Sequence, residues 1–335
     1  MQAAELTPLR RLYKHSRLRK FVRRRRNAMF YHLTRLALLP PRAVSLPRAL
    51  AIADRAGNLA YSTLPGLRRL ALHHVAIAFG DTLSPSAQDD IARAAYRSAA
   101  RCFIELAKLD EIRAHFDDYV SVEGWQHVDE VLALGRGGIV ITGHIGNWEL
   151  LAAYVARRGI SLAASARRLE DARLNKLLTD FRTGNGMHVI HRNTPGSSTE
   201  ILKVLRRRGV FALQIDQDIR TPSVTVPFFG RPARTPAAAA LLAVRRDLPV
   251  VPAFAQRRAE GGHHFVIKPP IFPPGSGDRQ RDIIEMTRQF SQALEDHIRQ
   301  HPTEWNWWHR RWRRPPVPGL DLDADGNSSP TPATR

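Results

Sequence analysis

The sequence predicts an α/β protein with a mixed central sheet flanked by helices, preceded by an amino-terminal helical region that associates with a membrane. Three observations predict this fold. From about residue 120, short apolar runs alternate with amphipathic segments, which is typical of βα units. Residues 48–110 have apolar positions spaced by three and four, as in helices. Residues 1–26 carry ten Lys or Arg and one acid, Glu5.

The composition indicates a folded protein with an anionic partner. Of the 335 residues, 43% are hydrophobic, which is enough for a sizeable core, and the formal net charge is +20. Such a charge attracts polyanions. Nucleic acid and an anionic membrane both satisfy this requirement, and composition alone does not choose between them.

Residues 1–47 are predicted to form the membrane-associating segment. The basic run Arg10–Arg26 is interleaved with apolar residues, and Ala28–Leu39 continues it. This pattern favours one or two helices lying at the membrane interface. Ala28–Leu39 is too short to span a bilayer and lacks a signal-peptide cleavage pattern, so we do not expect export. The alternative is a solvated or nucleic-acid-binding basic arm.

Residues 48–119 are predicted to be helical. Pro65-Gly66 and Ser84-Pro85 interrupt the pattern, and Ser84 is a plausible helix start. The single cysteine, Cys102, lies in this region, so an intrachain disulfide and a Cys-based zinc site are excluded. We expect a buried thiol and a reducing compartment.

Residues 120–314 are predicted to form the α/β core, and residues 315–335 a disordered tail, because they are rich in Pro and small residues. The predicted strands are Gly138–Thr142, Ile160–Ala164, Met187–Ile190, Val210–Ile215, Pro249–Gln256 and His263–Lys268. The predicted helices are Asn147–Arg158, Asp171–Thr183, Ser198–Arg208, Pro236–Arg246 and Arg279–Gln300.

The chemistry is expected at residues 143–149, Gly-His-Ile-Gly-Asn-Trp-Glu, where a strand gives way to a helix. Ligands gather at the carboxyl ends of strands in α/β sheets. Glu149 is predicted to orient the His144 imidazole, which then takes a proton from a hydroxyl. We also expect Asn147 to contact the substrate. The alternative assigns His144 to a turn and Glu149 to a solvated first helical turn.

Three further residues are candidates for the same site. Arg182 could bind a phosphate or an oxyanion through its forked donors, or be a surface arginine. Asp216 and Asp218 follow a predicted strand and are expected to orient sugar hydroxyls or basic neighbours. A metal site is not expected, because no HExxH or other ligand cluster accompanies them.

The closing segment, residues 305–314, contains four tryptophans and four arginines. Tryptophan beside arginine favours a membrane interface. The alternative is a carboxyl-terminal core plug whose rings pack while the arginines point outward. No P-loop, dinucleotide fingerprint or Gly-x-Ser-x-Gly elbow is present, so a covalent acyl-enzyme lacks a nucleophile.

These motifs together resemble the late acyltransferases of lipid A biosynthesis, within the glycerolipid and lysophospholipid acyltransferase group. His144 to Glu149 matches the hallmark of that family, a His and an acid separated by four residues. Further matching segments, in order over residues 120–314, are Ala166-Arg167-Arg168, Asn175, Arg182, residues 215–218, residues 226–230 and residues 304–312.

The resemblance implies an O-acyltransferase that moves a fatty acyl chain from acyl carrier protein or coenzyme A to a lipid A precursor or related glycolipid. It implies His144 as general base with Glu149 as its partner, and substrate binding by Arg167 and Arg182. It needs no further cofactor and no metal. It also implies a site at the cytoplasmic face of the inner membrane, peripheral or monotopic, with an anionic membrane surface as partner and no nucleic acid.

Two alternatives stay open. One is an acyltransferase for another acceptor, such as a phosphatidylinositol mannoside, a lysophospholipid or an aminolipid, because the hydrophobic anchor at Ala28–Leu39 is weaker than is typical of the family. The other is a non-catalytic protein that binds membranes or nucleic acid through its +20 charge. Binding of this second kind would depend steeply on salt and not on His144.

Overall fold

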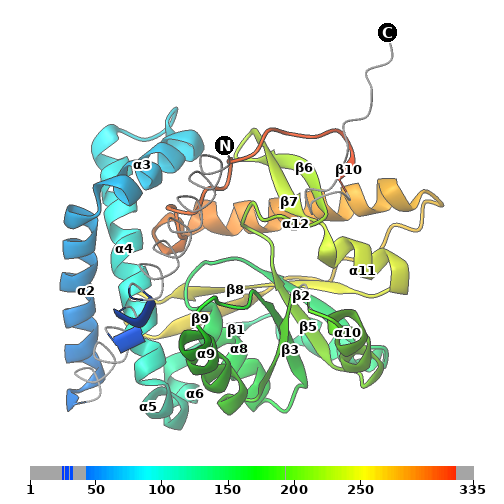
Figure 1. Cartoon of the computed structure of the whole chain (residues 1–335), viewed down its shortest axis with the longest axis horizontal. Helices are drawn as coiled ribbons and strands as arrows, with labels where there is room; N and C mark the ends of the chain where they lie inside the picture. The colour runs from blue at the N-terminus through cyan, green and yellow to red at the C-terminus, as the bar shows by residue number, and fades with distance from the viewer. Residues whose placement is uncertain (1–24, 26, 30, 33–42, 193, 322–335) are drawn as a thin grey trace, which may run out of the picture.

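The computed structural model describes residues 25, 27–29, 31–32, 43–192 and 194–321 (Figure 1). The predicted membrane-associating segment, residues 1–47, therefore lies mostly outside the described residues. Among the helices that are described, none has the length and apolar character needed to cross a bilayer.

A seven-stranded mixed sheet forms the centre of the molecule. Its order is β1-β9-β8-β2-β5-β3-β4, and all neighbours are parallel except the antiparallel pair β8 and β9. The strands are β1 Val120–Glu123, β2 Gly138–Thr142, β3 Leu162–Ala166, β4 Met187–His191, β5 Val210–Gln214, β8 Val250–Arg257 and β9 His263–Ile267. The mixed sheet and its six predicted strands are confirmed. The sequence did not predict β1, a four-residue strand at the edge of the described sheet, where its neighbour is β9.

Helices cover both faces of this sheet, which explains the continuous apolar strands. Along β2, Ile139 and Ile141 belong to the core beneath one set of helices, whereas Val140 packs toward the other. The first set comprises α10 Ser197–Arg206, α11 Ala238–Arg246 and α12 Arg279–Gln300, and the second comprises α7 Gln126–Ala133 and α8 Trp148–Arg157. Helix α9, Ala172–Gly184, packs beside β4.

The predicted helical region stands at one side of the sheet, drawn blue to cyan in Figure 1. It consists of α2 Leu46–Thr63, α3 Pro65–Phe79, α4 Pro85–Ala107, α5 Leu109–Ala114 and α6 Phe116–Tyr119. Ser84 caps α4 as predicted, because its Oγ accepts from the Ala87 amide at 3.3 Å. Cys102 is buried, also as predicted.

A second, three-stranded antiparallel sheet corrects two predictions. It consists of β6 Ser223–Phe228, β7 Arg231–Pro236 and β10 Leu320–Asp321. The β6–β7 hairpin was missed because its sequence is rich in proline, yet Phe229 and Gly230 supply the two positive φ angles of a tight hairpin turn. Pro236 ends β7 and does not begin α11. The predicted disordered tail is wrong for residues 315–321, where Val317 N donates to Thr225 Oγ1 and β10 pairs with β6.

Candidate active site

The loop after β2 carries His144 and is held by the carboxyl-terminal segment. Gly146 N donates to Glu304 O at 3.0 Å, and Asn306 N donates to His144 O at 3.2 Å. Gly146 has φ 53°, and a Cβ there would lie 2.1 Å from Ala255 O. Only glycine fits this close approach. The loop is therefore held between Ala255 on one side and the carboxyl-terminal segment on the other.

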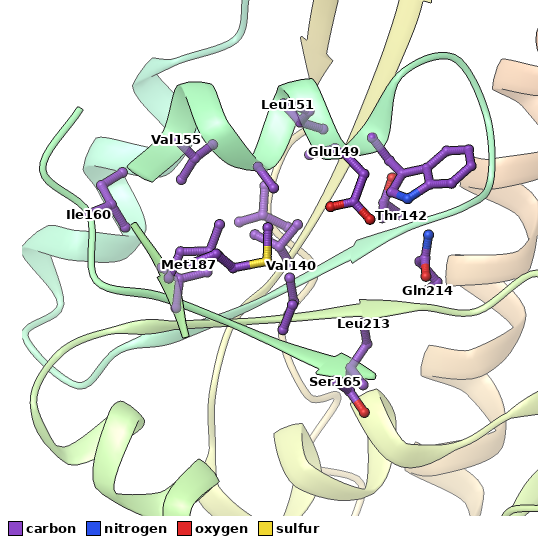
Figure 2. Close-up of a pocket in the computed structure, with 18 of the residues that line it drawn as sticks. Val140, Thr142, Glu149, Leu151, Val155, Ile160, Ser165, Met187, Leu213 and Gln214 are labelled. Carbon is purple, nitrogen blue, oxygen red and sulfur yellow. The ribbon is translucent and has the colours of Figure 1, made fainter. Parts of the chain in front are cut away.

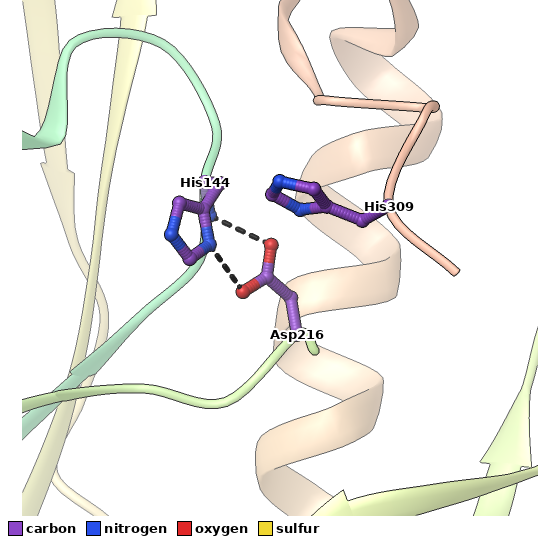
Figure 3. Close-up of side chains that lie close together, drawn as sticks. All are labelled: His144, Asp216 and His309. Carbon is purple, nitrogen blue, oxygen red and sulfur yellow. Dashed lines mark hydrogen bonds and ion pairs between the residues drawn. The ribbon is translucent and has the colours of Figure 1, made fainter. Parts of the chain in front are cut away.

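Asp216 is the carboxylate that orients His144 (Figure 3). His144 Nδ1 lies 2.8 Å from Asp216 Oδ1, and the His144 backbone amide donates to Oδ2 at 2.8 Å. Asp216 follows β5, which is the direct neighbour of β2, so the two strand ends bring these residues together. Although burial opposes ionisation, the charge and hydrogen bond of His144 hold the pKa of Asp216 below its ordinary value.

The predicted pairing of His144 with Glu149 is therefore wrong. Glu149 lies in the first turn of α8, and its carboxylate accepts from Arg182 Nε on α9, at 3.1 Å to Oε1 and 3.0 Å to Oε2. An arginine fork satisfies a nearly buried carboxylate better than a neutral ring does. Arg182 lies beside the site as predicted, but mainly as the partner of Glu149.

Asn147 does not face a substrate. It is 1% exposed, its Oδ1 accepts from the Leu150 amide at 3.1 Å, and its Nδ2 donates to Glu105 Oε2 at 2.9 Å. It caps α8 and anchors the loop, which corrects the prediction of substrate contact. Asn was a recognisable cap at this position.

Glu105 anchors the loop of the site through Asn147 and was not predicted from the sequence. It is completely buried on α4, where it accepts from Arg257 Nη2 at 3.1 Å and Tyr119 Oη at 2.8 Å and lies 3.0 Å from His263 Nε2. Burial opposes its ionisation, but His263 and Arg257 hold its pKa below the ordinary value. The available signal was helical spacing, which places Glu105 on the same buried face as Ser98 and Cys102.

His309 approaches His144 from the carboxyl-terminal segment. The two ring centroids are 4.8 Å apart and the rings are nearly perpendicular. The Gln217 amide lies between them, with Nε2 3.3 Å from His144 Nε2 and 3.1 Å from His309 Nδ1. Burial, with repulsion from His144, lowers the pKa of His309 to about 4. His309 is therefore neutral at physiological pH.

The closing segment is part of the core and of the site. Trp305 and Trp307 are fully buried, and Trp305 Nε1 donates to Asp216 Oδ2 at 2.9 Å. This supports the core plug over a membrane interface for these two rings. In the predicted plug the arginines point outward. Arg311 contradicts this, because it points inward and is 1% exposed.

Asp218 orients a basic neighbour, which was one of the two predicted roles. Its Oδ1 accepts from Arg314 Nε at 2.6 Å and its Oδ2 from the Arg314 amide at 2.9 Å. The side chain is 1% exposed. Asp218 thus fastens the end of the closing segment and is not available to sugar hydroxyls.

His144, Asp216 and His309 could in principle hold a metal, because one ligand atom from each lies within 4.8 Å of the others. However, His144 Nδ1 already bonds Asp216, and the second Asp216 oxygen accepts from Trp305. A metal would have to break these bonds. The arrangement fits a general base, with Nε2 as the ring nitrogen not used by Asp216.

An apolar pocket lies between α8 and the sheet, and we call it the α8 pocket (Figure 2). At one end it has Thr142, Glu149 and Gln214, and at the other Ile160 and Met187. Trp148 also lines it, and the Trp148 ring contacts the His144 ring at 4.8 Å. A slender apolar chain in this pocket would therefore end beside the candidate base.

Arg167 lies directly after β3 and is exposed. It does not touch the His144 and Asp216 pair, and among the described residues it has no hydrogen bond or ion pair. Its role in substrate binding is implied by the family resemblance alone.

The comparisons with known proteins all point to acyltransferases. A family model described as bacterial lipid A biosynthesis acyltransferase matches residues 19–314. A phosphatidylinositol mannoside acyltransferase of Mycobacterium tuberculosis (strain CDC 1551 / Oshkosh) is 27% identical over 197 residues, which is 57% of this chain and 59% of the relative. One of Mycolicibacterium smegmatis is 24% identical over 229 residues, 67% of this chain and 73% of the relative. The chain thus spans about three fifths of the M. tuberculosis relative.

Proposed function

The chain belongs to the bacterial lipid A biosynthesis acyltransferase family, and from this premise we propose that it transfers a fatty acyl chain from a thioester to a glycolipid hydroxyl. The observation that carries the proposal is the bond between His144 Nδ1 and buried Asp216 Oδ1, 2.8 Å long, beside the apolar α8 pocket. A carboxylate holding one ring nitrogen leaves the other as a base.

His144 Nε2 removes the proton of the acceptor hydroxyl, which takes the place of the Gln217 amide. The oxygen attacks the thioester carbonyl, and Asp216 stabilises the imidazolium that forms. When the tetrahedral intermediate collapses, the thiolate leaves and receives the proton from His144. Arg182 Nη1 makes no bond to Glu149, and we assign it to the developing oxyanion. No cofactor other than the acyl thioester takes part.

The donor is acyl carrier protein or coenzyme A, with the acyl chain in the α8 pocket. Acyl carrier protein is acidic, and the +20 charge of the chain favours it. For the acceptor, a lipid A precursor is the first candidate, as in the family description. A phosphatidylinositol mannoside is the second, favoured by the names of the relatives.

We further propose peripheral attachment to the cytoplasmic face of the inner membrane through the outer surface of α2 and α3. Large apolar side chains are exposed there, with four exposed arginines: Ile52, Leu59, Leu64, Leu67, Arg48, Arg55, Arg68 and Arg69. The single acid of these two helices, Asp54, is paired with Arg101. Within the described part of the chain none of these four arginines forms an ion pair, although Arg68 lies over the Tyr61 ring. Apolar side chains among such cations suit an anionic bilayer. Leu64→Gln with Leu67→Gln should reduce sedimentation with phosphatidylglycerol vesicles, and unchanged sedimentation would refute this surface.

The test of the reaction is transfer by purified protein, with acyl carrier protein and coenzyme A thioesters crossed with both acceptors. His144→Ala should abolish transfer, while His188→Ala, at an exposed ring on β4, should retain it. Lipid mass spectrometry of a deletion strain should show one missing acyl chain that only the wild-type gene restores. Equal transfer rates for wild type and His144→Ala would remove His144 from the mechanism, and no transfer by either protein would favour a non-catalytic binding protein.

A further inference from the structure

Two arginines meet at the carboxyl ends of the neighbouring strands β3 and β4. In this parallel pair, Ala166 lies opposite His191, so Arg167 and Arg192 follow at adjacent positions. The Arg192 amide donates to Ala166 O at 2.9 Å, which fixes the two backbones together. Burial lowers the pKa of Arg192, and repulsion from Arg167 lowers it further. The two cations therefore lie close enough to oppose each other.

No acid compensates this pair within the described part of the chain. Neither guanidinium makes a hydrogen bond or an ion pair there. Three acids lie nearby in sequence, and each is engaged: Glu200 lies 3.5 Å from His188, Asp171 accepts from Arg173, and Glu170 also has an interaction. A half-buried arginine that faces a second arginine without a carboxylate is costly, so the arrangement favours an anion from outside.

A cavity of about 210 Å³ opens beside Arg192, between α10, α11 and the sheet, and we call it the α10 cavity. Its polar rim includes Ser165, Ser197 and Thr221. Thr221 Oγ1 is buried, and within the described residues it has no hydrogen-bond partner. Buried polar atoms without partners are uncommon, and Thr221 lines the same cavity as Arg192.

The amino-terminal end of α10 adds to this positive rim. Its N-cap residue, Gly196, has φ 85° and no side chain to accept from the first amides of the helix. Such amides and the helix dipole favour an anion. The floor of the cavity is apolar and is formed by Ile190, Ile201, Phe211, Leu213, Ile215 and Ala239. A phosphate at the rim with an apolar substituent on the floor matches both parts.

We propose that the α10 cavity binds a phosphate ester carried by a partly apolar molecule, with Arg192 and Arg167 as its anion ligands. The proposal rests on the proposed function, because Ser165, Leu213 and Gln214 line both this cavity and the α8 pocket. The phosphate then belongs to one of the two substrates. It is either the phosphate of the glycolipid acceptor or the phosphopantetheine phosphate of the donor.

Binding is tested first without any reaction, by titrating the purified full chain calorimetrically with n-decyl phosphate. Arg192→Gln should weaken binding at least about tenfold, because hydrogen bonds to charged groups are the strong ones. Arg206→Gln is the matched control, since it removes the same charge from the other end of α10 and should bind as wild type does. Uncharged n-decyl glucoside should bind wild type poorly. Equal affinity of wild type and Arg192→Gln for n-decyl phosphate would overturn the proposal.

Kinetics then identify the source of the phosphate. Arg192→Gln should raise KM at least about tenfold for one substrate while kcat changes little. A raised KM for the acceptor assigns the site to the glycolipid phosphate, and a raised KM for the thioester assigns it to the donor. Unchanged KM for both substrates refutes the assignment.

Thermal stability separates this role from a structural one. Without ligand, Arg192→Gln should melt at or above the wild-type temperature, because it removes the repulsion by Arg167. A clearly lower melting temperature would indicate a structural arginine and overturn the proposal. Should wild type bind n-decyl phosphate but transfer no acyl chain, the cavity assignment would stand and the proposed reaction would fail.

Discussion

Two buried carboxylates, Asp216 and Glu105, fasten the two ends of the loop that carries His144, and each holds a histidine. Both are completely buried, and the pKa of each lies below its ordinary value. The histidines differ, because the His144 side chain is 18% exposed whereas that of His263 is fully buried. His144 also lies beside the α8 pocket through Trp148.

The partners of the two carboxylates explain the difference. Glu105 accepts from Arg257, Tyr119 and Asn147 as well as facing His263, so it compensates a buried cation and fixes the fold. Asp216 accepts from His144 and Trp305, and the ring that it orients still has a nitrogen to offer. The same acid and histidine chemistry therefore produces an anchor in one place and a base in the other. Access to the ring decides which.

Asp216→Asn should have the largest effect and tests the catalytic role of this carboxylate. The asparagine can still accept from Trp305, but it cannot stabilise an imidazolium, so transfer should fall about 10²- to 10⁴-fold. The rate of transfer from the acyl thioester measures this. Asp218→Asn is the matched control, two residues further on, and should lose far less because the Asp218 carboxylate bonds Arg314 and, among the described residues, no member of the His144 site. A fully active Asp216→Asn enzyme would remove Asp216 from the mechanism.

Glu105→Gln should show the opposite profile. It leaves Arg257 and His263 without a buried counter-charge, and breaking a buried pair costs about 3–5 kcal/mol. Denaturant unfolding should record that loss, with transfer per folded molecule less affected than in Asp216→Asn. Asp180→Asn removes an acid from an ion pair with Lys176 in which both side chains are exposed, and it should cost under about 1 kcal/mol. A stable Glu105→Gln protein would contradict the anchor role.

The sequence predicted this site unevenly, for a physical reason. His144 and Asp216 were both found because each follows an apolar strand, but their contact depends on β2 and β5 being neighbours, which strand patterns do not specify. Glu149 was given the role of Asp216 because proximity in sequence replaced proximity in the sheet. Glu105 and His309 come from elements 39 residues before and 165 residues after His144, so only the fold brings them to the loop.

The pH dependence of stability tests whether His309 is buried in its neutral form. The pKa of His309 is lowered to about 4 from an ordinary 6.5, so the unfolded chain takes up a proton that the folded chain refuses. Stability should therefore decrease as pH falls from about 6.5 to about 4, by on the order of 2–3 kcal/mol for this residue. His74 and His297, also lowered, add to the decrease. Unfolding of His309→Gln, compared at pH 7 and pH 5, should show a smaller difference than wild type. An identical difference would mean that His309 does not titrate in this range.

Trp305→Phe tests the smallest effect, the second support of Asp216. Phenylalanine keeps a buried ring but removes the Nε1 donor that lies 2.9 Å from Asp216 Oδ2, and a hydrogen bond to a charged group contributes about 2 kcal/mol. Trp307→Phe is the control, because the Trp307 Nε1 donates to a backbone carbonyl, Pro302 O, and not to the site. If Asp216 needs both donors to stay ionised and oriented, Trp305→Phe alone should move the acidic limb of the rate profile to higher pH. Equal profiles for the two variants would show that His144 by itself suffices to hold the carboxylate.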